Sequence, residues 1–256
     1  MEGIGIGEDG EPVGLVKPSD GKRVAFLIPS RGKPAEALLD SMEASCPLMD
    51  QAGYEAGIVF EVGNPYISAA RSLLLRKALD WKADHVVFID DDVSWRPQDL
   101  IKLLDTSGEV IAGTYRFKGP IEEYMGLLHD DPVTHRPEVR EDGCVRAELV
   151  PAGFLKLSKE AVGRFMRGYP ELCYGAPYAF HVDLFNHGAF EGRWWGEDYM
   201  FSKRWRAIGG ELWIVPDMEL CHWGGGNDHK GNFHEFLLRQ PGGSKHVKKF
   251  YEVMVA

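Results

Sequence analysis

The segment at residues 86–93 most constrains how this chain can fold. It reads Val-Val-Phe-Ile-Asp-Asp-Asp-Val. The apolar, β-branched half predicts a buried strand, and the carboxylates directly after it indicate that this strand leaves the core at Asp90. Open α/β sheets bind their ligands at such strand ends, so the position predicts a functional site. The alternative is an ordinary solvated turn, because an Asp-x-Asp pattern is common.

The three aspartates predict a site for a divalent cation. Alternate side chains of an extended chain point the same way, so we expect Asp90 and Asp92 to converge on one ion, with Asp91 facing elsewhere. A bound cation would offset the repulsion between the carboxylates. His222 is the candidate third ligand, and one imidazole beside two carboxylates favours Mn²⁺, with Mg²⁺ as the alternative.

The setting of His222 predicts motion as well as ligation. Three glycines follow Trp223, which indicates a mobile loop that closes over a bound ligand. A lone histidine is more often a structural residue, and that alternative stays open. His229 and His234 could extend the site, but their spacing matches no zinc motif.

The first half of the chain alternates between strand and helix patterns. Apolar runs at 23–28 and 57–62 predict strands, and residues 35–49 and 67–81 have helical patterns. Pro47 or Gly53 is expected to end the first helix. This rhythm predicts an α/β fold with a mostly parallel central sheet flanked by helices, joined by right-handed crossovers.

The second half continues the pattern with interruptions. Strands are predicted at 109–115, 151–157 and 211–215, and helices at 97–104, 158–166 and 196–208. Ser158 is expected to cap its helix. Residues 118–146 lack periodicity and predict loops or hairpins that decorate the sheet.

The aromatic residues between 168 and 195 have two interpretations. A cluster of this kind can stack on sugars or bases, but it more often fills a core. We expect core packing for most of them, including Tyr174 and Tyr178. Trp194 and Trp195 are the exceptions and the candidates for binding an acceptor, because they adjoin acidic residues.

Glu197 and Asp198 form a second acidic group, at the start of the helix predicted after Gly196. Carboxylates in a first helical turn commonly complement the helix dipole, which is the alternative to a chemical role. Gly196 would let a ligand approach the backbone closely. The dipole is also expected to keep Asp198 ionised at neutral pH, as a general base requires, although a low pKa would weaken it as a base.

Length and charge limit the domain organisation and the partners that this chain can have. The chain has 256 residues, enough for one large α/β domain. We expect a flexible leader at 1–21, a catalytic domain at 22–226, and a C-terminal loop and tail at 227–256 that cover the active site. The net charge of −10 disfavours an extended electrostatic binding surface for nucleic acid. The basic cluster at 245–249 is expected to be a solvated helix face more than a phosphate site.

Cysteine usage and hydropathy indicate the compartment. The four cysteines are far apart with no paired spacing, so neither a zinc site nor a disulfide framework is predicted. The N-terminus lacks the pattern of a signal peptide, and no run reaches the ~18 apolar residues of a membrane span. We therefore expect an intracellular, cytoplasmic protein with no membrane partner.

The order of the motifs resembles one family. A Pro-Ser-Arg-Gly turn, an Ala-Arg-Ser helix, the acidic strand end, Gly-Glu-Asp and Cys-His-Trp-Gly follow one another within residues 23–224. This order is similar to that of GT-A fold glycosyltransferases, in particular the small family-2-like and mannan-polymerase-like members of bacteria and phages. The resemblance implies the GT-A fold and transfer of a sugar from a nucleotide-sugar donor to an acceptor hydroxyl, with a divalent metal.

The resemblance also implies roles for individual residues. The implied donor-binding residues are Pro29, Ser30, Arg31, Arg71, Asp90 and Asp91, and the implied metal ligands are Asp90, Asp92 and His222. The implied catalytic residues are Asp198, as the base of an inverting enzyme, and its neighbour Glu197. Retaining relatives need no base at this position, so the stereochemistry stays open.

Other functions compete with this interpretation. A nucleotidyltransferase can share the sheet and the paired carboxylates. It usually has a Gly-rich phosphate-binding loop with Lys or Arg after its first strand, and the segment after the first strand here matches such a loop only weakly. A non-catalytic sugar-binding module would explain the aromatic residues but not the two acidic groups. The acceptor is either a glycan or a hydroxymethylated pyrimidine in phage DNA. DNA would require Lys203, Arg204 and Arg206 to line one groove with the cluster at 245–249.

Overall fold

The computed structural model describes residues 5–6, 12–13, 22–131, 133, 136–224 and 226–240. Within the predicted leader, β1 (Gly5–Ile6) and β2 (Pro12–Val13) pair antiparallel. The rest of the leader and the basic cluster at 245–249 lie outside the described residues. The division of the chain into leader, catalytic domain and covering tail stays a prediction.

A central sheet of eight strands organises the described part of the chain, in the order β4-β3-β5-β10-β7-β15-β9-β8. Its strands are β3 (Arg23–Ser30), β4 (Glu55–Val62), β5 (His85–Ile89), β7 (Val110–Ala112), β8 (Leu127–Leu128), β9 (Val145–Leu149), β10 (Phe154–Ser158) and β15 (Leu212–Ile214). β3 pairs parallel with β4 and β5, and β7 pairs parallel with β15. β10 is inserted antiparallel between β5 and β7, so these five strands still share one direction.

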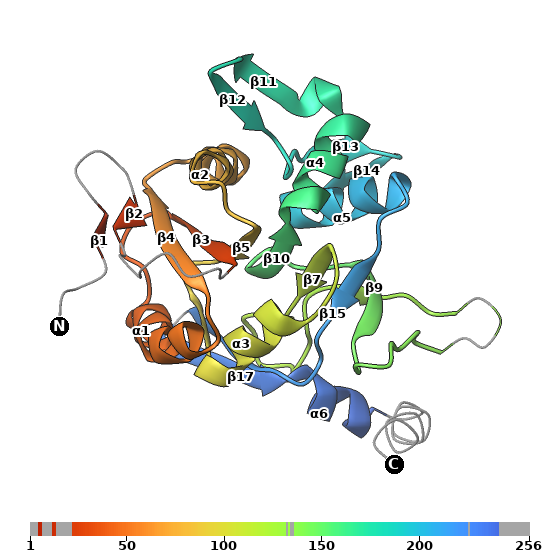
Figure 1. The fold of residues 1–256 in the computed structure, drawn as a ribbon. Coiled ribbons are helices and arrows are strands. Elements are labelled where there is room, and N and C mark those ends of the chain that lie inside the picture. Colours follow the sequence, from red (N-terminus) through yellow and green to blue (C-terminus); the bar gives the residue numbers. More distant parts are fainter. Residues whose placement is uncertain are drawn as a thin grey trace.

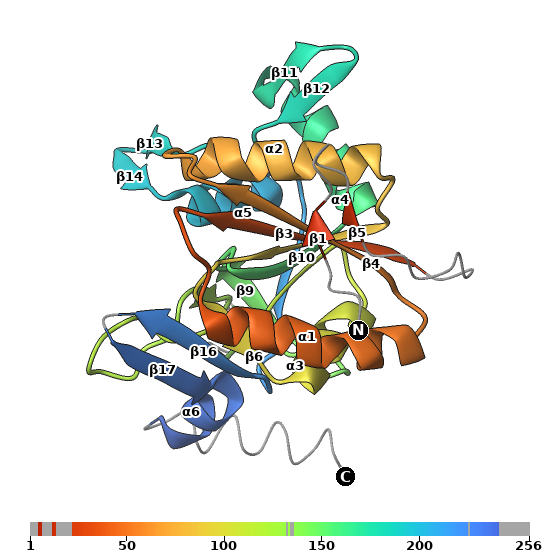
Figure 2. The same cartoon turned by 90° about the vertical axis from the view of Figure 1, so that its left-hand side faces the viewer.

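Helices cover both faces of this sheet (Figures 1 and 2). The helices are α1 (Glu36–Gln51), α2 (Ile67–Asp80), α3 (Pro97–Asp105), α4 (Lys159–Gly168), the short η1 (Pro170–Leu172), α5 (Glu197–Ala207) and α6 (Phe233–Arg239). α2, α4 and α5 lie on one face, and α1 and α3 lie on the other. The predicted α/β fold, with a mostly parallel central sheet flanked by helices, is confirmed.

The alternation of side chains along β3 and β5 explains this layering. Leu27 and Phe88 belong to the core under α2, α4 and α5. Phe26 and Val87 belong to the core under α1 and α3. Both strands are buried on both faces, which is why they read as continuous apolar runs. None of the helices in the described ranges combines the length and apolar content that crossing a bilayer requires.

Besides the β1–β2 pair, the described residues form three smaller sheets around the central one. β17 (Asn227–Asn232), β16 (Glu219–Gly224) and β6 (Val93–Trp95) form a three-stranded sheet. Two hairpins are built from β11 (Cys173–Ala176) with β12 (Ala179–Val182), and from β13 (Gly188–Phe190) with β14 (Arg193–Trp195). The prediction of a mobile loop at His222 is wrong, because this residue lies in β16 and pairs with strands on both sides.

Several local predictions can be compared with the structure. Ser158 accepts a hydrogen bond from the Ala161 amide at 3.1 Å, so the predicted N-cap is confirmed. Pro47 lies inside α1 and does not end it. The helix continues because Met49 is buried in the core, and Gly53, with φ of 77°, then turns the chain.

Two predictions about the second half need correction. Residues 118–146 were expected only to decorate the sheet, but β8 and the start of β9 extend the central sheet by hydrogen bonding to β15 and to each other. Core packing was expected for Tyr174 and Tyr178, but both side chains are exposed. They lie on the β11–β12 hairpin, which projects from the body of the molecule (Figure 2).

Candidate active site

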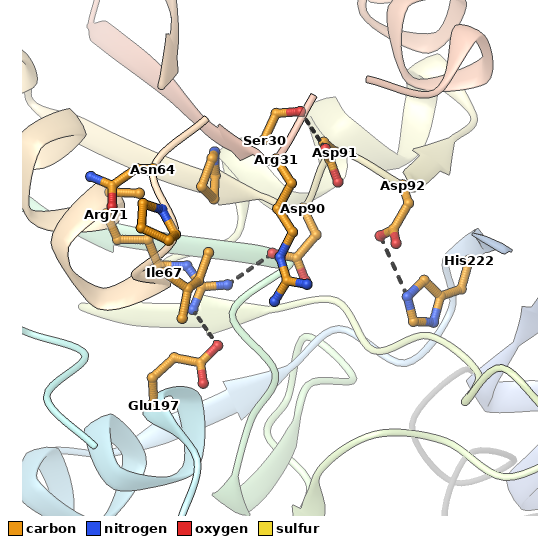
Figure 3. Close-up of a pocket in the computed structure, with 13 residues that line it drawn as sticks. Ser30, Arg31, Asn64, Ile67, Arg71, Asp90, Asp91, Asp92, Glu197 and His222 are labelled. Atoms are coloured by element: carbon orange, nitrogen blue, oxygen red, sulfur yellow. Dashed lines mark hydrogen bonds and ion pairs between the residues drawn. The ribbon is translucent and has the colours of Figure 1, made fainter. Parts of the chain in front are cut away.

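A pocket of about 470 Å³ lies where β3, β4 and β5 end. Its volume is in the range of small-molecule sites. The residues that line it are Pro29, Ser30, Arg31, Asn64, Pro65, Ile67, Ala70, Arg71, Asp90, Asp91, Asp92, Glu197 and His222 (Figure 3). The fold therefore brings most of the predicted site residues together, at the sheet edge where open α/β folds bind ligands.

The three aspartates lie in a turn. β5 ends at Ile89, and the Val93 amide donates a hydrogen bond to the Asp90 carbonyl at 3.1 Å. The alternation of an extended chain therefore does not orient these carboxylates, and that part of the prediction is wrong. Each aspartate instead contacts a different group of neighbours (Figure 3).

Arg71 links the two acidic groups of the sequence. Its guanidinium donates hydrogen bonds to Asp90 at 2.8 Å and to Glu197 at 3.0 Å. The side chain is only 3% exposed and lies over the Phe185 ring at 4.9 Å. Burial lowers the pKa of Arg71, but the nearby carboxylates outweigh burial and raise it. Arg71 therefore stays charged and holds Asp90 and Glu197 in place.

Asp90 is also held from the opposite side. The Tyr115 hydroxyl donates to Asp90 Oδ2 at 3.0 Å, and the Asp90 amide donates to the Gly153 carbonyl at 3.1 Å. A Cβ atom at Gly153 would lie 2.3 Å from Asp90 Oδ2 and 2.1 Å from the Tyr115 hydroxyl. Any side chain at this position would therefore displace Asp90 or Tyr115. Tyr115 and Gly153 were missed as site residues, and the available signal was the glycine at the start of a strand pattern.

Asp91 joins the acidic turn to the turn after β3. The Ser30 hydroxyl donates a hydrogen bond to its carboxyl group. Burial is the main cause that raises the pKa of Asp91, and Asp90 and Asp92 raise it further. Arg31 follows on the same turn; it is exposed and lines the pocket. Among the ion pairs of the described residues, none involves Arg31, so its charge is available to a ligand.

Asp92 and His222 form the other half of the acidic site. His222 Nε2 lies 3.4 Å from Asp92 Oδ1, and His222 Nδ1 lies 2.8 Å from the Arg116 carbonyl oxygen. Because a carbonyl only accepts, Nδ1 carries a proton and Nε2 is directed at the carboxylate. Burial raises the pKa of Asp92, but contacts with His222 and Lys118 outweigh it and hold the pKa below its usual value.

This pair fits a divalent cation in its chemistry. A carboxylate oxygen beside an imidazole nitrogen is a donor set for Mn²⁺, and a backbone partner on the second ring nitrogen is typical of a metal-binding histidine. Within the described ranges, no group of three His, Cys, Asp or Glu residues is arranged to hold a metal. His229 and His234 therefore do not complete a protein-only site with His222.

The two acids at the start of α5 have different surroundings. Glu197 lines the pocket, whereas Asp198 does not. Asp198 accepts a hydrogen bond from the Tyr199 amide at 2.8 Å. Burial and the adjacent Glu197 raise the pKa of Asp198 to about 6. The expected low pKa is wrong, because burial and the neighbouring charge outweigh the helix dipole.

The two candidate acceptor residues lie outside the pocket lining, on β14. Trp194 is 71% exposed and its ring meets that of His187 at 5.9 Å. Trp195 donates from Nε1 to the Phe190 carbonyl at 3.0 Å, and Lys203 Nζ lies 4.4 Å from its ring. The ring of Trp194 is thus mostly open to solvent, whereas Trp195 is bonded within the hairpin.

The basic residues of α5 are already bound to other groups. Lys203 pairs with Glu191 at 3.1 Å, and Arg206 lies 3.6 Å from Glu148. Arg204 donates to the Asn186 carbonyl at 2.6 Å. The structure therefore does not bring these three cations together as a free basic groove.

Comparisons with known proteins give similarity at the level of structure. No protein-family model matches the chain, and no curated protein matches it. One similar solved structure is A197 from STIV, with 16% identity, a TM-score of 0.48, and coverage of 79% of this chain and 86% of that one.

Two further solved structures are similar to this chain. The catalytic domain of Drosophila beta1,4galactosyltransferase 7 in complex with xylobiose has 17% identity and a TM-score of 0.42, over 75% of this chain and 64% of that one. S. aureus TarS 1-349 has 11% identity and a TM-score of 0.42, over 77% of this chain and 58% of that one. The chain thus spans less than two thirds of these two proteins.

Proposed function

We propose that this protein transfers a sugar from a nucleotide-sugar donor to an acceptor hydroxyl, as its motif order implies by resemblance to GT-A glycosyltransferases. The observation that carries the proposal is the pocket at the ends of β3, β4 and β5. It joins an exposed cation, Arg31, to the Asp92–His222 pair and to the carboxylates held by the buried Arg71. These are the groups that a nucleoside diphosphate and a divalent ion require.

The donor is proposed to lie against the turn after β3. Pro29 and Ser30 form the wall of the pocket, with Asp91 fixed behind them by Ser30. Arg31 supplies the mobile positive charge for the diphosphate. Arg71 has a different task in this proposal, since its guanidinium is bound to Asp90 and Glu197. It positions the two acids that border the donor.

Asp92 and His222 are the residues that would hold Mn²⁺ or Mg²⁺, with Asp90 at the edge of the same site. A divalent ion there would neutralise the negative charge that builds up on the leaving diphosphate. The hydrogen bond from His222 Nδ1 to Arg116 fixes the ring so that Nε2 faces Asp92. The diphosphate and water would supply the other ligands, since no third His, Cys, Asp or Glu of the described ranges is arranged with Asp92 and His222 to hold an ion.

Asp198 is the proposed base that accepts the proton of the acceptor hydroxyl. A pKa of about 6 leaves it mostly ionised at pH 7 and makes it a stronger base than an ordinary aspartate. Glu197 is paired with Arg71, so its charge is balanced while that of Asp198 stays available. This arrangement supports inversion of the anomeric centre, and the configuration of the product tests it.

The acceptor is proposed to approach along the β13–β14 hairpin, where Trp194 offers an exposed aromatic face. A glycan fits this surface better than DNA, because Lys203, Arg204 and Arg206 are already paired. Hydroxymethylated DNA is the second acceptor to test. All four cysteines are free thiols, which agrees with the proposed cytoplasmic setting.

A thermal-shift screen tests the donor class. The protein is mixed with Mn²⁺ and each of the common UDP-, GDP-, CMP- and dTDP-sugars, and in parallel with nucleoside triphosphates and with free sugars. A bound ligand raises the melting temperature. We expect a metal-dependent shift with one nucleotide. A shift with nucleoside triphosphates only would favour a nucleotidyltransferase, and a shift with free sugars only would favour a binding module.

Two variants locate the binding. Asp92→Ala should abolish the metal-dependent part of the shift, because it removes the carboxylate of the proposed metal pair. Asp142→Ala is the matched control, since Asp142 pairs with Arg140 and lies outside the pocket lining. An unchanged shift in Asp92→Ala would contradict the metal assignment.

A further inference from the structure

Lys118 occupies the side of Asp92 that His222 leaves open. Its ammonium group forms an ion pair with Asp92 Oδ2, while His222 Nε2 faces Asp92 Oδ1. Both carboxylate oxygens of Asp92, the proposed metal ligand, therefore already have a protein partner. Neither the strand pattern nor the resemblance singled out this lysine.

The chain is shaped to hold Lys118 there. A Cβ atom at Gly224 would lie 2.6 Å from Lys118 Cδ and 2.8 Å from Cε, so the lysine stem runs against the backbone of β16. The loop that carries Lys118 is closed by the Phe117 amide, which donates to the Glu123 carbonyl at 2.9 Å. Trp223, next to Gly224, donates its amide to the Asp92 carbonyl at 2.7 Å. Lysine, glycine and aspartate thus form one fitted contact.

We propose that Lys118 is a built-in counter-cation that competes with the divalent ion for Asp92. Its ammonium group leaves Asp92 when a diphosphate binds. An ammonium beside the carboxylate repels a second cation at the same oxygens. The Lys118 side chain is 38% exposed on a flexible four-carbon stem, so its charge can move to a phosphate oxygen. The metal alone then binds weakly, and metal and diphosphate strengthen each other's binding reciprocally.

This inference deepens the proposed function and rests on it for the metal-binding role of Asp92 and for the identity of the diphosphate ligand. The competing explanation is a surface ion pair with no effect on the site, because many such pairs contribute nothing measurable. The two explanations differ in what happens to metal affinity when the lysine charge is removed. Metal titration without any donor therefore separates them.

The experiment measures the dissociation constant for Mn²⁺ alone, by the loss of the free-ion electron paramagnetic resonance signal. Lys118→Met should bind Mn²⁺ about tenfold more tightly than the wild type, because the competing charge is gone. Gly224→Ala should also bind more tightly, but by a smaller factor, since it displaces the lysine without removing its charge. It also covers the case in which Lys118→Met fails to fold.

Lys230→Met is the matched control. Lys230 lies on β17 of the same small sheet and pairs with Glu219 at 2.7 Å, so this variant removes one positive charge without touching Asp92. Its affinity for Mn²⁺ should match that of the wild type within about twofold, because long-range charge effects are screened. The proposal is overturned if Lys118→Met binds Mn²⁺ no more tightly than Lys230→Met, including the case in which neither binds.

A second titration includes UDP or GDP, with correction for the manganese that the nucleotide binds in solution. The wild type should gain more in Mn²⁺ affinity from the nucleotide than Lys118→Met does, since the variant has no lysine to displace. An equal gain in both proteins would overturn the proposal. If both titrations give the expected results but no nucleotide-sugar donates its sugar to an acceptor, the proposed function fails while the role of Lys118 stands.

Discussion

Arg71 Nη1 and Glu197 Oε1 lie 3.0 Å apart, although the two residues are separated by 126 positions in the sequence. The same guanidinium reaches Asp90, so one buried cation joins α2, α5 and the end of β5. Carboxylates from two distant motifs become one network by this contact. The integrity of the pocket should depend on it.

Arg71→Met should destabilise the protein and impair ligand binding. The substitution leaves Asp90 and Glu197 without their shared cation, and such a loss costs 3–5 kcal/mol when the pair is fully buried. The side chains of Asp90 and Glu197 are 28% and 27% exposed, so we expect a smaller loss of about 2 to 3 kcal/mol in the free energy of unfolding. Urea denaturation measures this loss.

Lys77→Met is the control for this prediction. Lys77 lies on the same helix, its ion pair with Glu61 is longer, at 3.7 Å, and its side chain is 38% exposed, against 3% for Arg71. The loss in this variant should stay below about 1 kcal/mol. Equal losses in the two variants would show that the Arg71 network contributes no special stability.

Gly153→Ala should disable the site while the protein still folds. A methyl group at this position would overlap the Asp90 carboxylate and the Tyr115 hydroxyl, and the rigid tyrosine ring leaves Asp90 to move. We expect donor binding to weaken by at least about tenfold, since a displaced carboxylate breaks its bond to Arg71. Calorimetric titration with the donor found in the thermal screen measures the effect.

A glycine elsewhere in the fold provides the comparison. Gly163→Ala lies within α4, where an added Cβ atom would come no closer than 3.4 Å to Arg167. It should leave donor binding unchanged and stabilise the helix by about 0.5–1 kcal/mol. Wild-type binding in Gly153→Ala would show that the close approach to Asp90 has no functional weight.

The activity should depend on pH through Asp198. Its pKa of about 6 means that turnover should rise as the pH increases through 6, because only the ionised carboxylate accepts a proton. Asp198→Asn should lower turnover by about 10²- to 10⁴-fold and remove this pH dependence, while donor affinity stays close to that of the wild type. A pH–rate profile that is the same in both proteins would exclude Asp198 as the base.

The same shift predicts how stability changes with pH. The pKa of Asp198 in the folded protein, about 6, lies above its ordinary value of 3.8, so between these values the folded state binds more protons than the unfolded state. Its contribution to stability is therefore present below pH 4 and is lost as the pH rises through 6. The loss amounts to ~3 kcal/mol.

Asp198→Asn should remove this loss. The variant should match the wild type near pH 4 and exceed its free energy of unfolding by up to ~3 kcal/mol at pH 7. Asp40→Asn, at an exposed position on α1, should show no such difference. Guanidinium denaturation at the two pH values measures both variants. If Asp198→Asn differed from the wild type by the same free energy of unfolding at both pH values, the raised pKa would be ruled out.

The sequence by itself determined the elements of this protein. Apolar runs of strand length and helical periodicity located β3, β4, β5, α2 and α5 within a few residues, because burial of alternate or every third to fourth side chain is a local property of the chain. It also marked the strand end at Asp90 and the helix start at Glu197 as the two acidic points of the site.

Only the tertiary structure decided what those residues do to one another. It placed His222 on a paired strand, divided Asp90, Asp91 and Asp92 among Arg71, Ser30 and Lys118, and brought Gly153 against Asp90 and Tyr115. It also raised the pKa of Asp198 by burial beside Glu197. Contacts, burial and local charge depend on which distant segments pack against each other. The local pattern of apolar and polar residues does not show which segments these are.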